Sequence, residues 1–131
     1  MAYITKRIDT KNDLTVFTVT GKVPAGEIIA AIRDFFEAAV TSNVCWDFSE
    51  SDLSEIKTPD VKLIADLSSK YTYKRPSGKT AIVGTDDFTY GLLRMYEIIK
   101  DCSEVPILTQ AFRSIEEAYE WLTGTRAAGD E

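Results

Sequence analysis

The sequence predicts a single α/β domain with a mixed, mostly parallel sheet of five strands and four helices in the order ββαβαβαβα. Three observations indicate this class. After two opening extended segments, short apolar runs alternate with longer segments of helical periodicity, as in a parallel sheet covered by helices. The chain has 131 residues, which is the size of one domain. Hydrophobic residues make up 44% and charged residues 27% of it, as in ordinary globular proteins.

The first three elements are a hairpin and a helix. Extended segments are expected at 3–8 and 14–20, with Lys11, Asn12 and Asp13 forming the turn between them. Their β-branched residues and the Asn/Asp-containing link favour an antiparallel hairpin. The segment 24–40 then has apolar residues at helical spacing and begins with a proline suited to a helix start.

Three strand and helix pairs follow. We expect strands at 43–48, 80–84 and 105–112, and helices at 58–71, 86–102 and 114–122. The helix starts are indicated by Thr58 as a cap before Pro59, by Thr85 or Asp86, and by the pair Ser114 and Glu117, while Gly124 predicts the last helix end. The domain is expected to span residues 1–124, and residues 125–131 a flexible tail.

The helix 86–102 contains Gly91 near its middle, where glycine costs about 1 kcal/mol relative to alanine. The spacing predicts a buried face, with Gly91 on its flank, formed by Phe88, Leu92, Met95, Ile99 and Cys102. A residue without a side chain allows a close approach to the backbone. The leading interpretation is packing on the sheet or a neighbouring helix, and the alternative is a ligand or a partner subunit.

The side of this helix opposite to that face carries aromatic, leucine and arginine side chains, which are favoured in protein interfaces. It predicts an interface with another protein, or with a second copy in a homodimer, formed by Tyr90, Leu93, Arg94 and Tyr96. Packing of these residues on adjacent helices is the alternative.

The composition argues against several classes of function. There is no histidine, so His-dependent triads and mixed Cys/His zinc sites are excluded. The net charge of −6 disfavours nucleic acid as a partner. No signal peptide or membrane-spanning segment is recognised, and two distant cysteines are interpreted as structural thiols, so we expect a cytoplasmic protein without membrane insertion. We also expect no metal, no cofactor and no catalytic residue, because the sequence has no calcium-loop or paired-carboxylate spacing, no nucleotide-binding glycine motif and no CxxC motif.

Four segments carry a resemblance to a known family: WDF at 46–48, TAIVG at 80–84, YGLLRMYE at 90–97 and AFRSIEEAYEWL at 111–122. With the predicted element order, they resemble the SpoIIAA-like family of the wider STAS group, named for sulfate transporters and anti-sigma-factor antagonists. The resemblance covers about residues 4–122. It implies a mixed sheet with a first hairpin and little about activity. We expect a non-catalytic domain that acts by binding another protein or itself.

The resemblance also suggests phosphosite candidates. Anti-sigma-factor antagonists carry a serine that a kinase phosphorylates at the start of the helix after the third strand, where added charge switches partner binding. Here the corresponding region SESDLSEIKTPD, at 49–60, is longer and has no glycine. Its nearest hydroxyl groups are those of Ser54 and Thr58.

A small apolar or anionic ligand is the alternative to a protein partner. Ligands of open α/β sheets bind beyond the carboxyl ends of the parallel strands, and we expect such a ligand near Trp46, Phe48 and Tyr90. The ligand candidates are Trp46, Asp47, Thr85 and Gly91.

Two charged segments complete the candidates. Lys74, Arg75 and Lys79 lie in a basic stretch of this acidic protein and are candidates for anion binding; a solvated connection shaped by Pro76 and Gly78 is the alternative. The acidic residues between positions 47 and 55 are interpreted first as loop structure. An enzyme that uses Asp47 or Glu50 is the third functional hypothesis.

Overall fold

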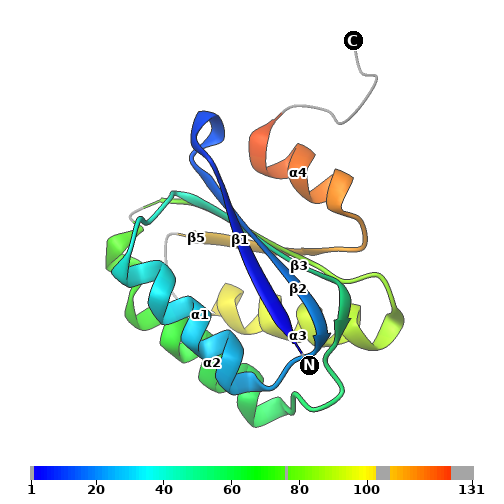
Figure 1. Cartoon of the computed structure of the whole chain (residues 1–131). Helices are drawn as coiled ribbons and strands as arrows, with labels where there is room; N and C mark the ends of the chain where they lie inside the picture. The colour runs from blue at the N-terminus through cyan, green and yellow to red at the C-terminus, as the bar shows by residue number, and fades with distance from the viewer. Residues whose placement is uncertain (1, 76, 103–106, 125–131) are drawn as a thin grey trace.

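The computed structural model describes residues 2–75, 77–102 and 107–124, which form one sheet of five strands and four α-helices (Figure 1). The strands lie in the order β1-β2-β3-β4-β5; β1 is antiparallel to β2, and all other neighbours are parallel. The strands are β1 (Tyr3–Asp9), β2 (Leu14–Lys22), β3 (Asn43–Asp52), β4 (Gly78–Val83) and β5 (Ile107–Phe112). The helices are α1 (Ala25–Glu37), α2 (Thr58–Lys70), α3 (Asp87–Cys102) and α4 (Ile115–Thr123). The predicted single-domain α/β class and its element order are confirmed.

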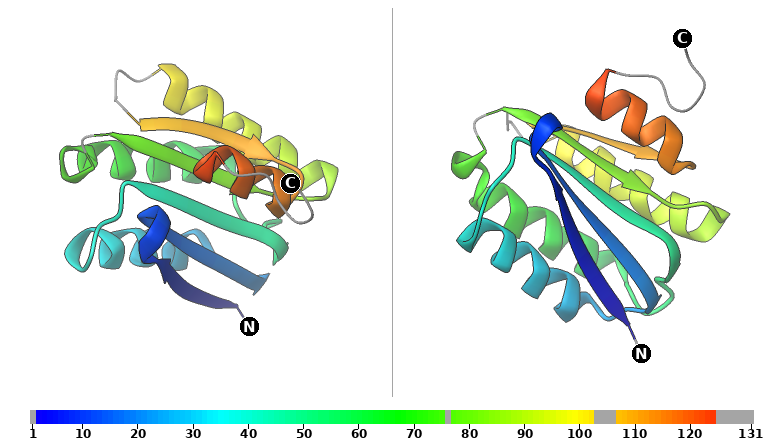
Figure 2. Two further views of the ribbon diagram at one scale, coloured as in Figure 1. Left: turned by 90° about the horizontal axis from the view of Figure 1, so that it is seen from above. Right: turned by 45° about the horizontal axis from the view of Figure 1, so that its top comes forward.

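The helices cover the two faces of the sheet unequally. α1, α2 and α3 lie on one face and α4 lies on the other (Figures 1 and 2). This follows from the connectivity, because successive parallel strands joined by crossovers of one hand place their helices on the same side. No helix in the described ranges is long and apolar enough to cross a lipid bilayer.

The two faces have separate cores because successive side chains of a strand point to opposite faces. Under α1–α3, the ring of Trp46 stacks on Phe17, with centroids 4.2 Å apart, and on Phe48, at 5.9 Å. Under α4, the core contains Leu14, Cys45 and other small or branched residues. Burial raises the pKa of the Cys45 thiol to about 12, in agreement with the predicted structural role.

Some element boundaries differ from the predictions. β3 continues past residue 48 to Asp52, because Glu50, Ser51 and Asp52 pair with the end of β2. α1 ends at Glu37 rather than at 40. The predicted start of the last strand at 105 and the tail 125–131 lie outside the described residues.

The caps explain where the later helices begin and end. Asp86 accepts hydrogen bonds from Thr89 N (2.8 Å) and Thr89 Oγ1 (3.0 Å), which selects Asp86 over Thr85 as the cap of α3. Ser114 Oγ accepts from Glu117 N at 3.1 Å, and α4 ends at Gly124 with φ 72°, both as predicted. In α2 the cap is Lys57, and Thr58 is already helical.

The predicted orientation of α3 is correct only in part, because Leu92, Met95 and Ile99 are partly buried against the main core. The residues buried against the rest of the molecule are Thr89, Leu93 and Lys100. Two of the residues expected inside lie outside, since Phe88 is 56% exposed and Cys102 is also exposed. The inner face of this helix includes a threonine and a lysine, so hydrophobic spacing alone placed the centre of the buried face incorrectly.

The leading interpretation of Gly91 is wrong as well. Gly91 is exposed, and a Cβ atom built on it would meet no atom within 4 Å. Within the described chain, therefore, neither the sheet nor a neighbouring helix explains the glycine.

Gly91→Ala is expected to stabilise the isolated domain by about 1 kcal/mol, because alanine has the higher helix propensity and the added methyl group meets nothing. Urea unfolding at several pH values measures the change. Gly124→Ala is the matched control: it also has open space, but its φ of 72° disfavours a side chain, so it should destabilise. Destabilisation by Gly91→Ala would contradict the open geometry.

Candidate functional site

The three basic residues predicted to bind anions point in three directions. Lys74 Nζ donates to the carbonyl of Phe36 at the end of α1, at 3.0 Å. Lys79 Nζ donates to the carbonyl of Trp121 in the last turn of α4, at 2.8 Å. Both lysines thus satisfy helix carbonyls that lack intrahelical partners. The structure does not bring them into one surface patch with Arg75.

Arg75 is directed into the protein, and only 8% of its surface is exposed. Its guanidinium donates to Thr80 Oγ1 at 2.9 Å, to the carbonyl of Ser42 at 2.7 Å and to the carbonyl of Lys79 at 3.1 Å. These acceptors are all neutral. The Arg75 Nε–H is buried and has no hydrogen-bond partner among the residues that the structure describes.

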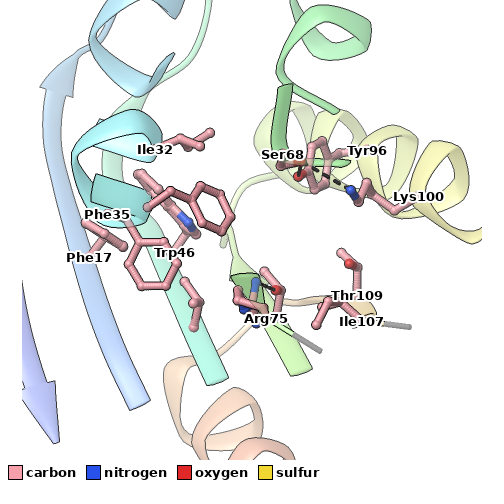
Figure 3. A pocket seen from close by; sticks show the side chains of 13 residues that line it. Phe17, Ile32, Phe35, Trp46, Ser68, Arg75, Tyr96, Lys100, Ile107 and Thr109 are labelled. Atoms are coloured by element: carbon pink, nitrogen blue, oxygen red, sulfur yellow. Dashed lines mark hydrogen bonds between the residues drawn. The ribbon is translucent and has the colours of Figure 1, made fainter. Parts of the chain in front are cut away.

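A second buried cation, Lys100, comes from the inner face of α3. It is 6% exposed, and its Nζ donates to Ser69 Oγ at 2.7 Å and to Ser68 Oγ at 3.2 Å, both on α2. The Tyr96 hydroxyl shares a hydrogen bond of 2.9 Å with Ser68 Oγ. Figure 3 shows this group facing Arg75 across a pocket.

The environment disfavours the charge on both cations. Burial lowers the pKa of Arg75 to about 10. Burial, and then the nearby Arg75 charge, lower the pKa of Lys100 to about 8. Burial also raises the pKa of the Tyr96 hydroxyl, which keeps that group neutral.

Arg75 and Lys100 line one pocket of about 50 Å³ between the sheet and the helices α1–α3 (Figure 3). Ser68, Tyr96 and two threonines add hydroxyl groups, and aromatic and aliphatic side chains form the remaining wall. No acidic side chain is among the described residues that line it. The pocket therefore combines positive charge, hydroxyl groups and apolar surface.

An apolar pocket of about 70 Å³ lies beside this basic pocket. The two share four lining residues: Ile32, Trp46, Thr80 and Tyr96. The second pocket is otherwise lined by aliphatic and aromatic side chains of the main core. The two pockets thus adjoin, one lined partly by cationic and hydroxyl groups and the other mainly by apolar side chains.

The four predicted ligand residues do not converge. Trp46 lines both pockets, whereas Asp47, its neighbour in β3, packs on the other side and accepts from Ser49 N at 3.0 Å and Ser49 Oγ at 2.6 Å. Thr85 is exposed beyond the end of β4, and Gly91 lies on the outer side of α3. Strand alternation separates Trp46 from Asp47.

The four predicted interface residues do not share a surface either. Leu93 is buried in the core, and Tyr96 lines the basic pocket. Arg94 is exposed and pairs with Glu97 at 2.7 Å. Tyr90 is half-buried, with the Arg113 guanidinium 4.2 Å from its ring centroid. Contact of a partner with Tyr90 and Arg94 stays a prediction, whereas Leu93 and Tyr96 are covered within the domain.

The phosphosite candidates and the acidic segment lie at the entry to α2. Ser54 and Thr58 are exposed, and their phosphorylation stays a prediction. Asp52 accepts from Ser54 N at 2.9 Å, which is the loop role expected for this segment. Among the described residues, no three His, Cys, Asp or Glu side chains gather in a group suited to a metal ion.

Sequence reasoning missed Lys100 and its serine partners on α2. The signal that could have found this lysine is helical spacing, because Lys100 follows Leu93 by two turns and Tyr96 by one. Once Leu93 is placed inside, Lys100 must lie inside too.

With this geometry established, the fold can be compared with solved proteins. An anti-sigma factor antagonist from Mycobacterium paratuberculosis aligns with a TM-score of 0.63 at 13% identity, over 93% of this chain and 94% of that chain. An uncharacterised DUF3478-family protein with a SpoIIAA-like fold from Shewanella loihica gives 0.57 at 16% identity, over 92% of this chain and 93% of that one. The anti-sigma factor antagonist SpoIIAA, in its unphosphorylated form, gives 0.54 at 13% identity, over 94% of this chain and 100% of that one.

These likenesses define a SpoIIAA-like fold, which confirms the sequence resemblance at the level of the fold. No family model matches the chain, and no curated protein matches it by sequence.

Proposed function

We propose that this domain acts by binding another protein, and that the outer side of α3 is its contact surface. Two solved proteins with this fold are named anti-sigma factor antagonists, a name that describes action through protein partners. The single observation that carries the proposal for this chain is a row of apolar and small residues on α3, most of which are exposed.

This row, the α3 seam, consists of Phe88, Gly91, Met95, Ile98 and Cys102. Its members alternate by three and four residues, which is the spacing by which one helix packs along another. Phe88 is 56% and Ile98 is 52% exposed, and Gly91 and Cys102 are exposed as well, whereas Met95 is partly buried against the main core. A continuous apolar stripe of this kind favours a docking role over isolated surface residues.

Gly91 supports the same interpretation. It lies within the seam, and the space around it is open, so a partner backbone can approach α3 closely there. The exposed residues beside the seam carry both signs of charge: Asp101, Arg94 and Asp87, which pairs with Arg113 at 3.0 Å. The complementary partner is an amphipathic helix with an apolar stripe.

A photo-crosslinking amino acid placed at position 98 tests the proposal in the native host. We expect one discrete adduct from position 98 and none from position 63 on α2, where Leu63 is similarly exposed at 54% but lies off the seam. The mass of the adduct distinguishes a different partner from a second copy of the chain. The same pattern from both positions, or no adduct from position 98, would contradict the proposal.

Ile98→Glu is expected to weaken association with the crosslinked partner at least about tenfold, because it places a charge in an apolar contact. The free energy of unfolding should change by less than about 0.5 kcal/mol, since the side chain is exposed. Leu63→Glu is the matched control and should leave affinity unchanged. Titration calorimetry or sedimentation measures the affinities; equal effects of the two variants would argue against the seam.

A further inference from the structure

We propose that a groove beside β5, between α3 and α4, binds an extended peptide segment that carries an arginine. This β5 groove has a volume of about 650 Å³ and is lined by Tyr90 of α3, residues 110–113, and Glu117, Glu120 and Trp121 of α4. The peptide adds a strand to the edge of the sheet and directs its arginine at Glu117. The groove is separate from the α3 seam, so the proposal adds a second contact surface and does not depend on the first.

The edge of the sheet is the first argument. β5 is the outermost strand on its side, and no described strand lies beyond it (Figure 2). The N–H of Ala111 donates to Glu97 Oε1 on α3 at 2.7 Å, whereas the carbonyl of Phe112 accepts from Gly84 N at 3.0 Å. Because the backbone groups of successive residues point to opposite sides of a strand, the N–H and C=O of Thr109 and the C=O of Ala111 point outward. An extended peptide can pair with these groups.

Charge complementarity is the second argument, and it indicates a basic peptide. Glu117 lines the groove and is exposed. Arg113, the one cation among the described residues that line the groove, pairs with the Asp87 carboxylate at 3.0 Å. The negative charge that Glu117 brings to the groove is therefore available to a basic side chain of a partner.

The aromatic wall of the groove indicates arginine in particular. The Tyr90 ring has the Arg113 guanidinium 4.2 Å from its centroid, and the Trp121 ring has the Lys79 ammonium at 5.1 Å. Both rings thus accept cations within the domain. Glu117 and Trp121 are four residues apart on α4, so their side chains are neighbours. A guanidinium can stack on an aromatic ring and also donate two parallel hydrogen bonds to a carboxylate, which an ammonium group cannot do.

The exposed face of β5 indicates which residues flank the arginine. Leu108 is 61% exposed, and it lies on the same face of the strand as Gln110, which lines the groove. In a paired peptide, the residue two positions from the arginine lies on this face as well. An apolar residue at that position would cover Leu108.

The experiment titrates the full chain with the peptide acetyl-Val-Thr-Arg-Thr-Val-amide and follows the backbone amide signals by NMR. The signals of residues 107–113 should shift, with a dissociation constant of about 0.1–1 mM. A peptide with citrulline in place of arginine has a similar shape and no charge, and it should bind at least about fivefold more weakly. Methylation of every amide nitrogen of the peptide should weaken binding by a similar factor, because it removes the donors that pair with β5.

Glu117→Lys should weaken binding of the arginine peptide at least about fivefold, because it replaces the carboxylate with a like charge. Glu116→Lys is the matched control: it changes the net charge equally at the neighbouring exposed position of α4, outside the groove lining, and should change affinity by less than about twofold. Ile98→Glu should leave peptide binding unchanged, which separates this site from the α3 seam.

Three results would overturn the proposal. The first is equal binding of the arginine and citrulline peptides, and the second is equal losses in Glu117→Lys and Glu116→Lys, which would show unspecific charge attraction. The third is the absence of shifts at residues 107–113 when the arginine peptide is present at about 10 mM.

Discussion

Lys100→Met should make the unliganded domain more stable at pH 7, by about 2 kcal/mol. The pKa of Lys100 is lowered from 10.5 to about 8, mainly by burial, which corresponds to about 3 kcal/mol against the folded state. Solvent screening at the pocket and the loss of the hydrogen bonds to Ser68 and Ser69 reduce this gain to about 2 kcal/mol. Methionine has a similar length and no charge, so it fills the same space without that cost.

The stabilisation by Lys100→Met should depend on pH and should decrease as the pH rises. Between pH 8 and 10.5 the unfolded chain binds more protons at this lysine than the folded protein does, so the wild type gains stability as the pH rises. Below pH 8 both states are protonated, and the full cost applies. The advantage of Lys100→Met should therefore shrink by about 1 kcal/mol between pH 7 and 9.

The measurement is urea unfolding of both proteins at matched pH values. Among the described residues, Arg75 lowers the pKa of Lys100 and Asp66 raises it, and the Tyr96 hydroxyl lies near Ser68. All of them are present in both proteins, so their own titration largely cancels in the difference. A variant less stable than the wild type at pH 7, or a difference independent of pH, would show that Lys100 carries no desolvation cost.

The strand positions and the helix ends were predicted from the sequence because short-range signals, such as caps and apolar runs, indicate the same structure as the burial pattern does. The buried position of Cys45, the caps Asp86 and Ser114, and the end at Gly124 all follow from short-range chemistry. Each signal lies within a few residues of the feature that it determines.

The candidate site was harder to predict because it breaks those local rules. Lys100 is a lysine on the inner side of a helix, and Phe88 is a phenylalanine on the outer side. Hydrophobic spacing alone would place Phe88 on the buried side of the helix and Lys100 on the exposed side. Their placement depends on the serines of α2 and on the pocket, which come together only in the folded chain. Functional sites are where such conflicts are expected.

Gly78→Ala is expected to be the most destabilising small change in this region, at about 3–4 kcal/mol. Gly78 begins β4 with φ +131°, a conformation that side chains disfavour. A Cβ atom on it would lie 1.9 Å from the carbonyl oxygen of Ser42, which is backbone and cannot rotate away. Neither the strain nor the clash can be relieved by a side-chain rotation, so the backbone has to move.

The consequence extends to the basic pocket, because the same Ser42 oxygen accepts the Arg75 guanidinium at 2.7 Å. Moving that carbonyl displaces Arg75, so loss of this hydrogen bond should add to the destabilisation of Gly78→Ala. Thermal unfolding of the wild type and the variant measures the total change in stability. Gly26→Ala provides the comparison, since no atom lies within 4 Å of its added Cβ and α1 tolerates alanine. A Gly78→Ala protein with wild-type stability would show that the backbone at Ser42 or Gly78 can move and so avoid the clash. The inference that Ser42 holds Arg75 in a fixed position would then be wrong.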